Sequence, residues 1–138
     1  MIPRRVYEHM TPSPHTIGRD QPLAKAHELM RRFGVRHLPV LDGGVLVGIV
    51  SERDLRLLES VADVDVHRTL VEEAMTPEPY IAAPDALLRD VAAEMIEHKY
   101  GCAVVMDRAA VVGIFTTVDA LRALLALERD VSSSRVVA

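Results

Sequence analysis

Apolar residues recur at helical spacing in the first third of the chain. Four of them lie three or four residues apart: Leu23, Ala26, Met30 and Phe33. This spacing predicts a helix with one buried face. Asp20 is a suitable N-cap for this helix, Pro22 fits its first turn, and Gly34 is expected to end it.

Two short apolar runs follow the helix and predict a pair of strands. They are residues 35–41 and 45–50, and the Asp-Gly-Gly sequence between them is typical of a tight turn. The second run is apolar throughout, which predicts burial on both faces. Pro39 removes one backbone donor, so the first strand is expected to lie at a sheet edge or to bend there. Ser51 then opens a second helix.

The same series of elements occurs twice. When the sequence is shifted by 65 residues, 15 of the 50 positions from Val6 to Leu55 are identical to their counterparts, without a gap. Unrelated segments would match at roughly 3 such positions. Met-Thr-Pro and Val-Gly-Ile sequences coincide in the two copies. The chain therefore contains a duplicated unit of about 50 residues.

Each copy is expected to contain an extended segment, a helix, two strands and a final helix. In the second copy Asp85 is expected to cap the first of these helices. Half a chain is too small to hold a core alone, so the halves should pack about an approximate twofold axis in a two-layer α+β fold. The predicted boundaries are 6–60 for the first motif, 61–70 for a connector, 71–128 for the second motif and 129–138 for a disordered tail that contains three serines.

Composition narrows the class of protein. A chain of 138 residues with 49% hydrophobic and 26% charged residues is typical of one globular domain. A formal net charge of -4 disfavours nucleic-acid binding through phosphates. Cys102 is the single cysteine and forms no internal disulfide, which fits a cytoplasmic protein. No apolar stretch approaches the ~20 residues of a membrane helix, so neither a membrane span nor a signal peptide is expected.

The repeated Ser/Thr-x-x-Asp sequences are the first candidates for a functional site. Ser51 and Asp54 stand where a buried strand turns into a helix, and Thr116 and Asp119 hold the same place in the second copy. One interpretation is helix capping, worth about 1 kcal/mol. The other is ligand binding, because free N–H groups and the helix dipole attract phosphate to that end. The two interpretations are compatible.

The ordered set of motifs resembles the CBS motif, and the pair resembles a tandem CBS module (a Bateman module) over nearly the whole chain. The resemblance rests on Met-Thr-Pro, the apolar helix, the strand Val35–Asp42 and the segment Val47–Leu55, with counterparts in the second copy. It implies a stand-alone regulatory sensor without a catalytic domain. In relatives, clefts between the repeats bind AMP, ADP, ATP or S-adenosylmethionine, and an aspartate accepts hydrogen bonds from both ribose hydroxyls. The module forms homodimers in these relatives.

The resemblance implies two ligand clefts, each with residues from both copies. Carried over to this sequence, cleft A comprises Thr11, Thr16, Ile17, Val35, Arg36, His37, Thr116 and Asp119. Cleft B comprises Ser51, Asp54, Thr76, Ile81, Tyr100, Gly101 and Cys102. Arg36 and His37 suit phosphates and favour cleft A, although a solvated strand edge explains them as well. Tyr100 offers cleft B a stacking ring, but the equivalent strand lacks a cation and departs from the common pattern.

Other residues are assigned structural roles. The six histidines are scattered without the spacing of metal ligands, and Cys102 is expected to be a small buried hydrophobe. Leu121, Leu124 and Leu125 are expected to be shared between the core and a dimer surface.

The sequence therefore predicts a non-catalytic homodimeric sensor for an adenosine-containing ligand. No required cofactor or metal is expected, and the effector protein cannot be read from the chain. The alternative is a structural homodimerisation module whose clefts are vestigial and unoccupied.

Overall fold

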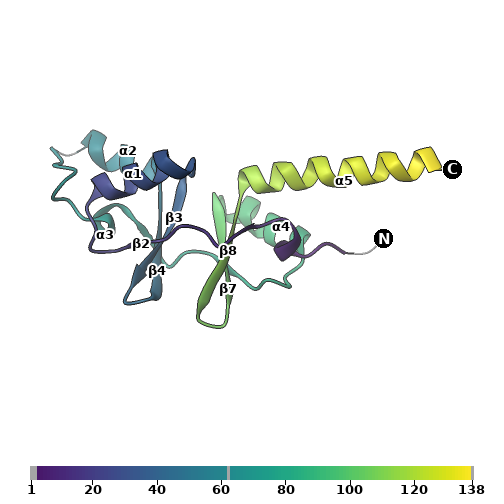
Figure 1. Ribbon diagram of the computed structural model, residues 1–138, viewed down its shortest axis with the longest axis horizontal. Coiled ribbons are helices and arrows are strands. Elements are labelled where there is room, and N and C mark those ends of the chain that lie inside the picture. Colours follow the sequence, from purple (N-terminus) through teal and green to yellow (C-terminus); the bar gives the residue numbers. More distant parts are fainter. Residues whose placement is uncertain (1–2, 62, 138) are drawn as a thin grey trace. The chain divides into compact units, whose positions relative to one another are not determined.

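A computed structural model of the chain describes residues 3–61 and 63–137, with side chains up to residue 131 (Figure 1). The chain divides into two compact units. Unit 1 is formed by Met1–Ser13 together with Tyr80–Ala138, and unit 2 by Pro14–Pro79. Each unit contains a four-stranded sheet and helices, which confirms the α+β fold class predicted from the sequence.

Unit 2 is built around two antiparallel strands joined by a glycine turn. Its sheet has the order β2-β3-β4-β5, with strands β2 (Ile17–Gly18), β3 (His37–Asp42), β4 (Val45–Ser51) and β5 (Thr76–Pro77). Gly43 and Gly44 have φ values of 56° and 84°, which side chains rarely adopt, and they form the predicted tight turn. The helices are α1 (Leu23–Phe33), α2 (Glu52–Val61) and α3 (Val71–Ala74).

Unit 1 repeats this arrangement with the second copy of the strands. Its sheet has the order β1-β8-β7-β6, with strands β1 (Thr11–Pro12), β6 (Ile81–Ala82), β7 (Cys102–Asp107) and β8 (Ala110–Thr116). The helices are the 3-10 helix η1 (Val6–Glu8), α4 (Leu88–His98) and α5 (Thr117–Val137). The long α5, yellow-green in Figure 1, runs out beyond the strands of its own unit.

The opening segment of each copy belongs to the sheet of the other copy. Thr11 in β1 pairs with Ile114 in β8, and Thr76 in β5 pairs with Ile49 in β4. The body of each copy keeps its own pairings, with β2 parallel to β3 and β6 parallel to β7. Each compact unit of the structure therefore combines the body of one repeat with the opening segment of the other.

The exchange explains why two motifs recur together. A Cβ atom on Gly48 would lie 2.6 Å from Sδ of Met75, and a Cβ on Gly113 would likewise collide with Sδ of Met10. The methionine of each Met-Thr-Pro sequence thus occupies the space left by the glycine of the other copy's Val-Gly-Ile sequence. A Cβ on Gly48 would also lie 2.9 Å from the backbone carbonyl oxygen of Thr76, so a side chain there would push on the exchanged segment, whereas at Gly113 the Met10 side chain would have to move.

Each unit encloses its own hydrophobic core. In unit 2 the core comprises Ile17, Leu23, Ala26, Met30, Leu38, Val40, Val50, Leu55 and Val71. In unit 1 it comprises Val6, Ala82, Val91, Met95, Ala103, Val105 and Phe115. Three members of the predicted helical stripe are buried, while Phe33 at its end is exposed. Val6 and Val71 come from the exchanged segments, so the exchange contributes to both cores.

The predicted caps of the first helix in each copy are wrong. The N-caps of α1 and α4 are Pro22 and Leu87, and neither Asp20 nor Asp85 caps a helix. Backbone carbonyls take over this function instead. The N–H of Leu23 donates to the carbonyl of Thr69 at 2.9 Å, and the N–H of Leu88 donates to the carbonyl of Arg4 at 2.9 Å. At least one N–H group at the start of each helix is thus satisfied by a segment distant in sequence.

The helix end predicted for the first copy is confirmed, and the helix of the second copy ends at a residue for which the sequence made no prediction. Gly34 ends α1 with φ 64°, as predicted, whereas Lys99 ends α4 with φ 58°. A residue with a Cβ is strained in this left-handed conformation.

The C-terminal segment differs from expectation, whereas Pro39 meets it in part, because the register of β3 and β4 shifts between Val40 and Leu41. Pro39 lies in the interior strand β3 rather than at an edge, but β2 pairs with β3 only from Val40 onward, so Pro39 has a paired strand on one side. The expected disordered tail from residue 129 is replaced by the continuation of α5 to Val137. Each added helical residue contributes a backbone hydrogen bond, and Asp130 pairs with Arg4 at 2.5 Å.

Candidate functional site

Ser51 and Asp54 form a reciprocal pair where β4 ends and α2 begins. The N–H of Ser51 donates to Oδ2 of Asp54 at 2.9 Å, and the N–H of Asp54 donates to Oγ of Ser51 at 3.0 Å. This geometry confirms the capping interpretation. It also fixes the direction of the Asp54 carboxylate, which is half-buried.

Thr116 and Asp119 form the equivalent pair where β8 meets α5. The N–H and Oγ1 of Thr116 donate to Oδ2 of Asp119 at 2.9 and 3.1 Å, and the N–H of Asp119 donates back to Oγ1 at 3.2 Å. Asp119 is only 4% exposed, and it is the one buried charged residue among those with described side chains. A carboxylate at this depth is stable only when it is hydrogen-bonded.

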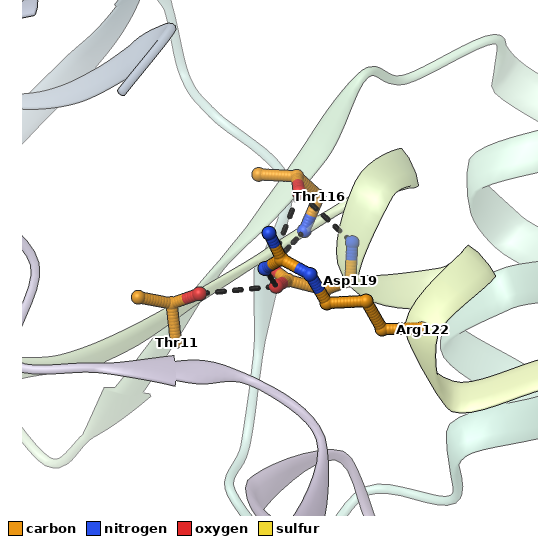
Figure 2. Close-up of polar contacts among 4 residues, drawn as sticks. All are labelled: Thr11, Thr116, Asp119 and Arg122. Atoms are coloured by element: carbon orange, nitrogen blue, oxygen red, sulfur yellow. Dashed lines mark hydrogen bonds and ion pairs between the residues drawn. The ribbon is translucent and has the colours of Figure 1, made fainter. Parts of the chain in front are cut away.

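Two further side chains reach Asp119 (Figure 2). Thr11 Oγ1 donates to Oδ1 of Asp119 at 3.0 Å, and Nη1 of Arg122 lies 3.5 Å from the same oxygen. Thr11 comes from the exchanged strand β1, so the exchange brings together three residues predicted for cleft A: Thr11, Thr116 and Asp119. Arg122 was not predicted from the sequence, because its counterpart in the first copy is Leu57 and no repeat marks it.

The remaining residues predicted for cleft A lie in unit 2. Thr16 is half-buried, and Ile17 on β2 is buried in the core of that unit. Val35, Arg36 and His37 lead into β3. The side chain of Arg36 is 79% exposed and lies 3.8 Å from the Glu52 carboxylate, while its carbonyl accepts the N–H of Glu52. The structure thus places Arg36 at the first turn of α2, beside Ser51 and Asp54.

The residues predicted for cleft B are also divided between the units. Ser51, Asp54 and Thr76 belong to unit 2, where Thr76 is exposed on β5. Ile81, Tyr100, Gly101 and Cys102 belong to unit 1. Cys102 is buried, as predicted. The carbonyl of Gly101 accepts the N–H of Thr117 at 3.3 Å, which ties the start of β7 to the start of α5.

A row of stacked rings accompanies Tyr100. Its ring centroid lies 5.1 Å from that of Tyr80 and 5.1 Å from that of His98. Burial raises the pKa of the Tyr80 phenol, and nearby Glu94 adds to the shift. In unit 2 the counterparts of Tyr80 and His98 are His15 and Phe33, which stack at 3.6 Å.

The stacked rings were not predicted from the sequence. A usable signal was present, because the 65-residue shift aligns His15 with Tyr80 and Phe33 with His98. The pairs His15–Phe33 and Tyr80–Tyr100 each join the extended segment before β2 or β6 to the end of a helix, whereas His98 and Tyr100 both lie at the end of α4. The rings therefore hold these segments in place in both units.

Unit 2 also contains a hollow of about 570 Å³ that the sequence did not predict. Its lining comprises Thr16, Ile17, Gly18, Arg19, Asp20, Leu41, Asp42, Gly43, Gly44 and Glu72. The Arg19 guanidinium donates to Glu72 at 2.7 Å and to Asp42 at 3.2 Å, and both hydrogen bonds raise the pKa of Arg19. The charges on its walls are thus largely paired with one another.

Two further searches concern the described residues only. Among residues 3–61 and 63–137, no group of three or more His, Cys, Asp and Glu side chains is placed to hold a metal ion. Within the same ranges, no helix has the length and apolar character needed to span a membrane.

These features define a duplicated α+β protein with a Ser/Thr–Asp pair at a strand–helix junction in each unit. The family model of the CBS domain matches residues 6–60 and 71–126. The chain belongs to the CBS domain family. It is 30% identical to the CBS domain-containing protein YhcV of Bacillus subtilis over 109 residues, which cover 79% of this chain and 77% of YhcV.

Solved structures of similar proteins contain adenosine compounds. The structure of CBSX2 from Arabidopsis thaliana in complex with AMP has a TM-score of 0.74 and 29% identity, and covers 90% of this chain and 98% of CBSX2. The CBS domain pair of MJ0100, in complex with 5′-methylthioadenosine and S-adenosyl-L-methionine, has a TM-score of 0.82 and 25% identity, and covers 91% of this chain and 98% of that one.

Other relatives are longer proteins. Inosine-5′-monophosphate dehydrogenase of Korarchaeum cryptofilum is 30% identical over 105 residues, which make up 75% of this chain but 21% of the dehydrogenase. The similarity therefore concerns a part of that enzyme.

Proposed function

We propose that this protein is a non-catalytic regulatory module that binds an adenosine-containing ligand. The observation that carries the proposal is the carboxylate held at a helix start by the hydroxyl residue three positions before it, once in each unit. An oriented carboxylate is a good acceptor for the two hydroxyls of a ribose. The AMP complex of CBSX2 and the MJ0100 complex support an adenosine ligand for a CBS pair.

The proposal assigns separate roles to the groups at the strand–helix junction. At least one of Asp54 and Asp119 accepts hydrogen bonds from the ribose hydroxyls, and the helix dipole attracts phosphate to the helix start. The residue sets of cleft A and cleft B remain predictions of the sequence. The proposed ligand is one of four adenosine compounds: AMP, ADP, ATP or S-adenosylmethionine.

Regulation by such a module requires a ligand that prefers one conformation. A ligand with micromolar affinity supplies about 8 kcal/mol of binding free energy. Only the part that differs between two conformations shifts their populations, typically ~1–3 kcal/mol. The module would transmit this difference to a partner protein in the cytoplasm.

A thermal-shift series with AMP, ATP and S-adenosylmethionine tests the proposal. At ~100 times the dissociation constant, the ligand should raise the unfolding midpoint by several degrees. The Asp54→Asn/Asp119→Asn double variant should lose this rise while it remains folded by circular dichroism. Incubation with ATP should yield no product. No rise with any of the three compounds would refute adenosine binding.

The second candidate is a structural homodimerisation module with unoccupied clefts. Leu121, Leu124 and Leu125 favour it, because all three are exposed on α5 rather than shared with the core. Ala123 fills the buried position in this turn instead. An exposed leucine stripe suits a second copy of the chain, and self-association is compatible with the proposed sensor as well. This candidate predicts a dimer in sedimentation that no adenosine compound stabilises.

A further inference from the structure

The end of α1 and the start of α2 bring exposed arginines together on unit 2. The N–H of Glu52 donates to the carbonyl of Arg36 at 2.9 Å, which ties the first residue of α2 to the segment that follows α1. The arginines of this region are all exposed, and together they form what we call the arginine face: Arg31, Arg32, Arg36, Arg53 and Arg56.

A contact between the two helices shows which of these arginines lie at the same level. His27 Nε2, in the middle of α1, lies 2.8 Å from Oε2 of Glu59, near the end of α2. The helices therefore run in opposite directions. Arg31 comes four residues after His27 and Arg56 three residues before Glu59, so both lie one turn from this contact in the same direction. Arg53 follows one turn further along α2.

The carboxylates of the region neutralise only part of this face. Glu52 is paired with Arg56 and lies 3.8 Å from the guanidinium of Arg36. Among the residues with described side chains, none forms an ion pair with Arg31 or Arg53. These two guanidinium groups therefore keep donors that a carboxylate can accept in a bidentate manner.

The face is positive on a chain that is otherwise acidic. Residues 31–36 and 51–56 contain five arginines and two carboxylates, an excess of three positive charges. The whole chain has a net charge of -4, so the remaining residues carry -7. The arginine face is thus a local concentration of charge against the overall balance.

The fold itself does not require arginines at these positions. Under the 65-residue shift the counterparts of Arg31, Arg53 and Arg56 are, in this order, Ile96, Val118 and Leu121. All three apolar side chains are exposed in unit 1, as the arginines are in unit 2. The same helix pair therefore forms with either kind of surface, and the charge is a property of one face only.

Exposed apolar side chains lie beside the arginines. Leu57 is exposed and comes four residues after Arg53, which places both on the same side of α2. Phe33 is partly exposed at the end of α1, and the Arg32 guanidinium lies 5.2 Å from the centre of its ring. Arginine and aromatic residues are enriched at protein interfaces, where they supply much of the binding energy.

We propose that the arginine face of unit 2 docks an acidic segment of a partner protein. The carboxylates of the segment pair with Arg31 and Arg53, and an apolar side chain of the segment packs against Leu57 and Phe33. A second copy of the chain fits poorly, because its own arginine face would bring like charges together. Nucleic acid fits poorly as well, because the acidic remainder of the chain repels phosphates. The docking site goes beyond the proposed adenosine site and does not depend on it.

A fluorescein-labelled peptide of glutamate and leucine tests the docking site by fluorescence anisotropy, without any nucleotide. The unaltered protein should bind this peptide, and rising KCl should release it, because salt screens the attraction between charges. The same peptide with glutamine in place of glutamate should bind about tenfold more weakly. The Arg31→Glu/Arg53→Glu double variant should also bind about tenfold more weakly, and Leu57→Ser severalfold more weakly.

The matched control is the Arg89→Glu/Arg129→Glu double variant. It changes the net charge by the same amount, but both arginines are exposed on helices of unit 1. It should keep its affinity for the peptide within about twofold. Circular dichroism checks that each variant is folded, and Arg31→Gln/Arg53→Gln, which removes the charges without reversing them, should give an intermediate loss. Arg36 stays unaltered throughout, because the sequence assigned it to cleft A.

Each outcome decides for or against the proposal. Loss of binding in Arg31→Glu/Arg53→Glu but not in the control supports it. No binding of the peptide at millimolar concentration, or an equal loss in both double variants, would overturn it. The acidic protein segment is also wrong if these arginines bind a DNA duplex or phosphatidylglycerol vesicles more tightly than the peptide, or if their reversal changes the sedimentation of the protein alone. A failure of adenosine binding leaves all these results unchanged.

Discussion

A Val6→Ala substitution should destabilise unit 1, to which Val6 belongs, and should leave unit 2 unaffected. Val6 is 0% exposed and belongs to the same core as Val91 and Phe115. The segment next to it in the chain, Pro14–Pro79, forms unit 2. A Val6→Ala variant therefore distinguishes two arrangements: one in which the opening segments are exchanged between the copies, and one in which each repeat folds by itself.

The magnitude follows from burial. Val6→Ala removes two methyl groups, which lowers the transfer contribution by about 1.6 kcal/mol at ~0.8 kcal/mol per carbon. A residual cavity of roughly 50 Å³ adds about 1.2 kcal/mol at ~24 cal/mol per Å³. The free energy of unfolding of unit 1 should therefore fall by about 2–3 kcal/mol. Val71→Ala is the matched control, because Val71 is also 0% exposed and holds the counterpart position in unit 2.

Native-state hydrogen exchange followed by mass spectrometry reads out this loss by segment. In Val6→Ala the protection of α4, β7 and β8 should fall by about 30-fold or more, since 1.4 kcal/mol corresponds to a factor of ten. In Val71→Ala the same loss should appear in α1, β3 and β4. If Val6→Ala instead accelerated exchange mainly within residues 14–79, the exchange of opening segments would be refuted.

Three further predictions concern single side chains. Lys99→Gly should stabilise the protein by up to about 1 kcal/mol in urea unfolding, because it relieves the left-handed end of α4, whereas Glu97→Gly within α4 should destabilise it. Leu121, 61% exposed on α5, should be needed for self-association, so Leu121→Lys should give a monomer in sedimentation velocity, and an unaltered dimer would exclude this face. Because the pKa of Tyr80 is raised, the neutral phenol is favoured in the folded state; this stabilisation is present below pH ~10 and is lost as the pH rises through the raised pKa. Tyr80→Phe should remove that part of the stability loss in unfolding curves between pH 8 and 11, and an identical loss in both proteins would contradict the assignment.

Features that depend on neighbouring residues were predictable from the sequence. The helical stripe, the Asp-Gly-Gly turn and the end of α1 at Gly34 follow from side-chain spacing and from φ preferences. The Ser51–Asp54 and Thr116–Asp119 pairs were predictable for the same reason, because a capping bond spans three residues. In each case the interacting groups lie within one turn of each other.

Contacts between distant residues were predicted less well. The caps assigned to Asp20 and Asp85 were wrong because carbonyls of Thr69 and Arg4 already satisfy the helix starts. Two-residue strands such as β1 and β5 carry too few side chains to show any period. Their pairing partners are therefore invisible in the pattern of apolar and polar positions.

The sequence by itself determined the duplication, the order of the longer helices and of the paired strands between them, and the position of an acidic residue at each strand–helix junction. Only the tertiary structure decided that the opening segments are exchanged and that Thr11 and Arg122 contact the Asp119 carboxylate. The physical reason is sequence separation. A hydrogen bond between residues 108 positions apart, such as that between Thr11 and Asp119, leaves no local trace in the chain and forms only when unit 1 is packed.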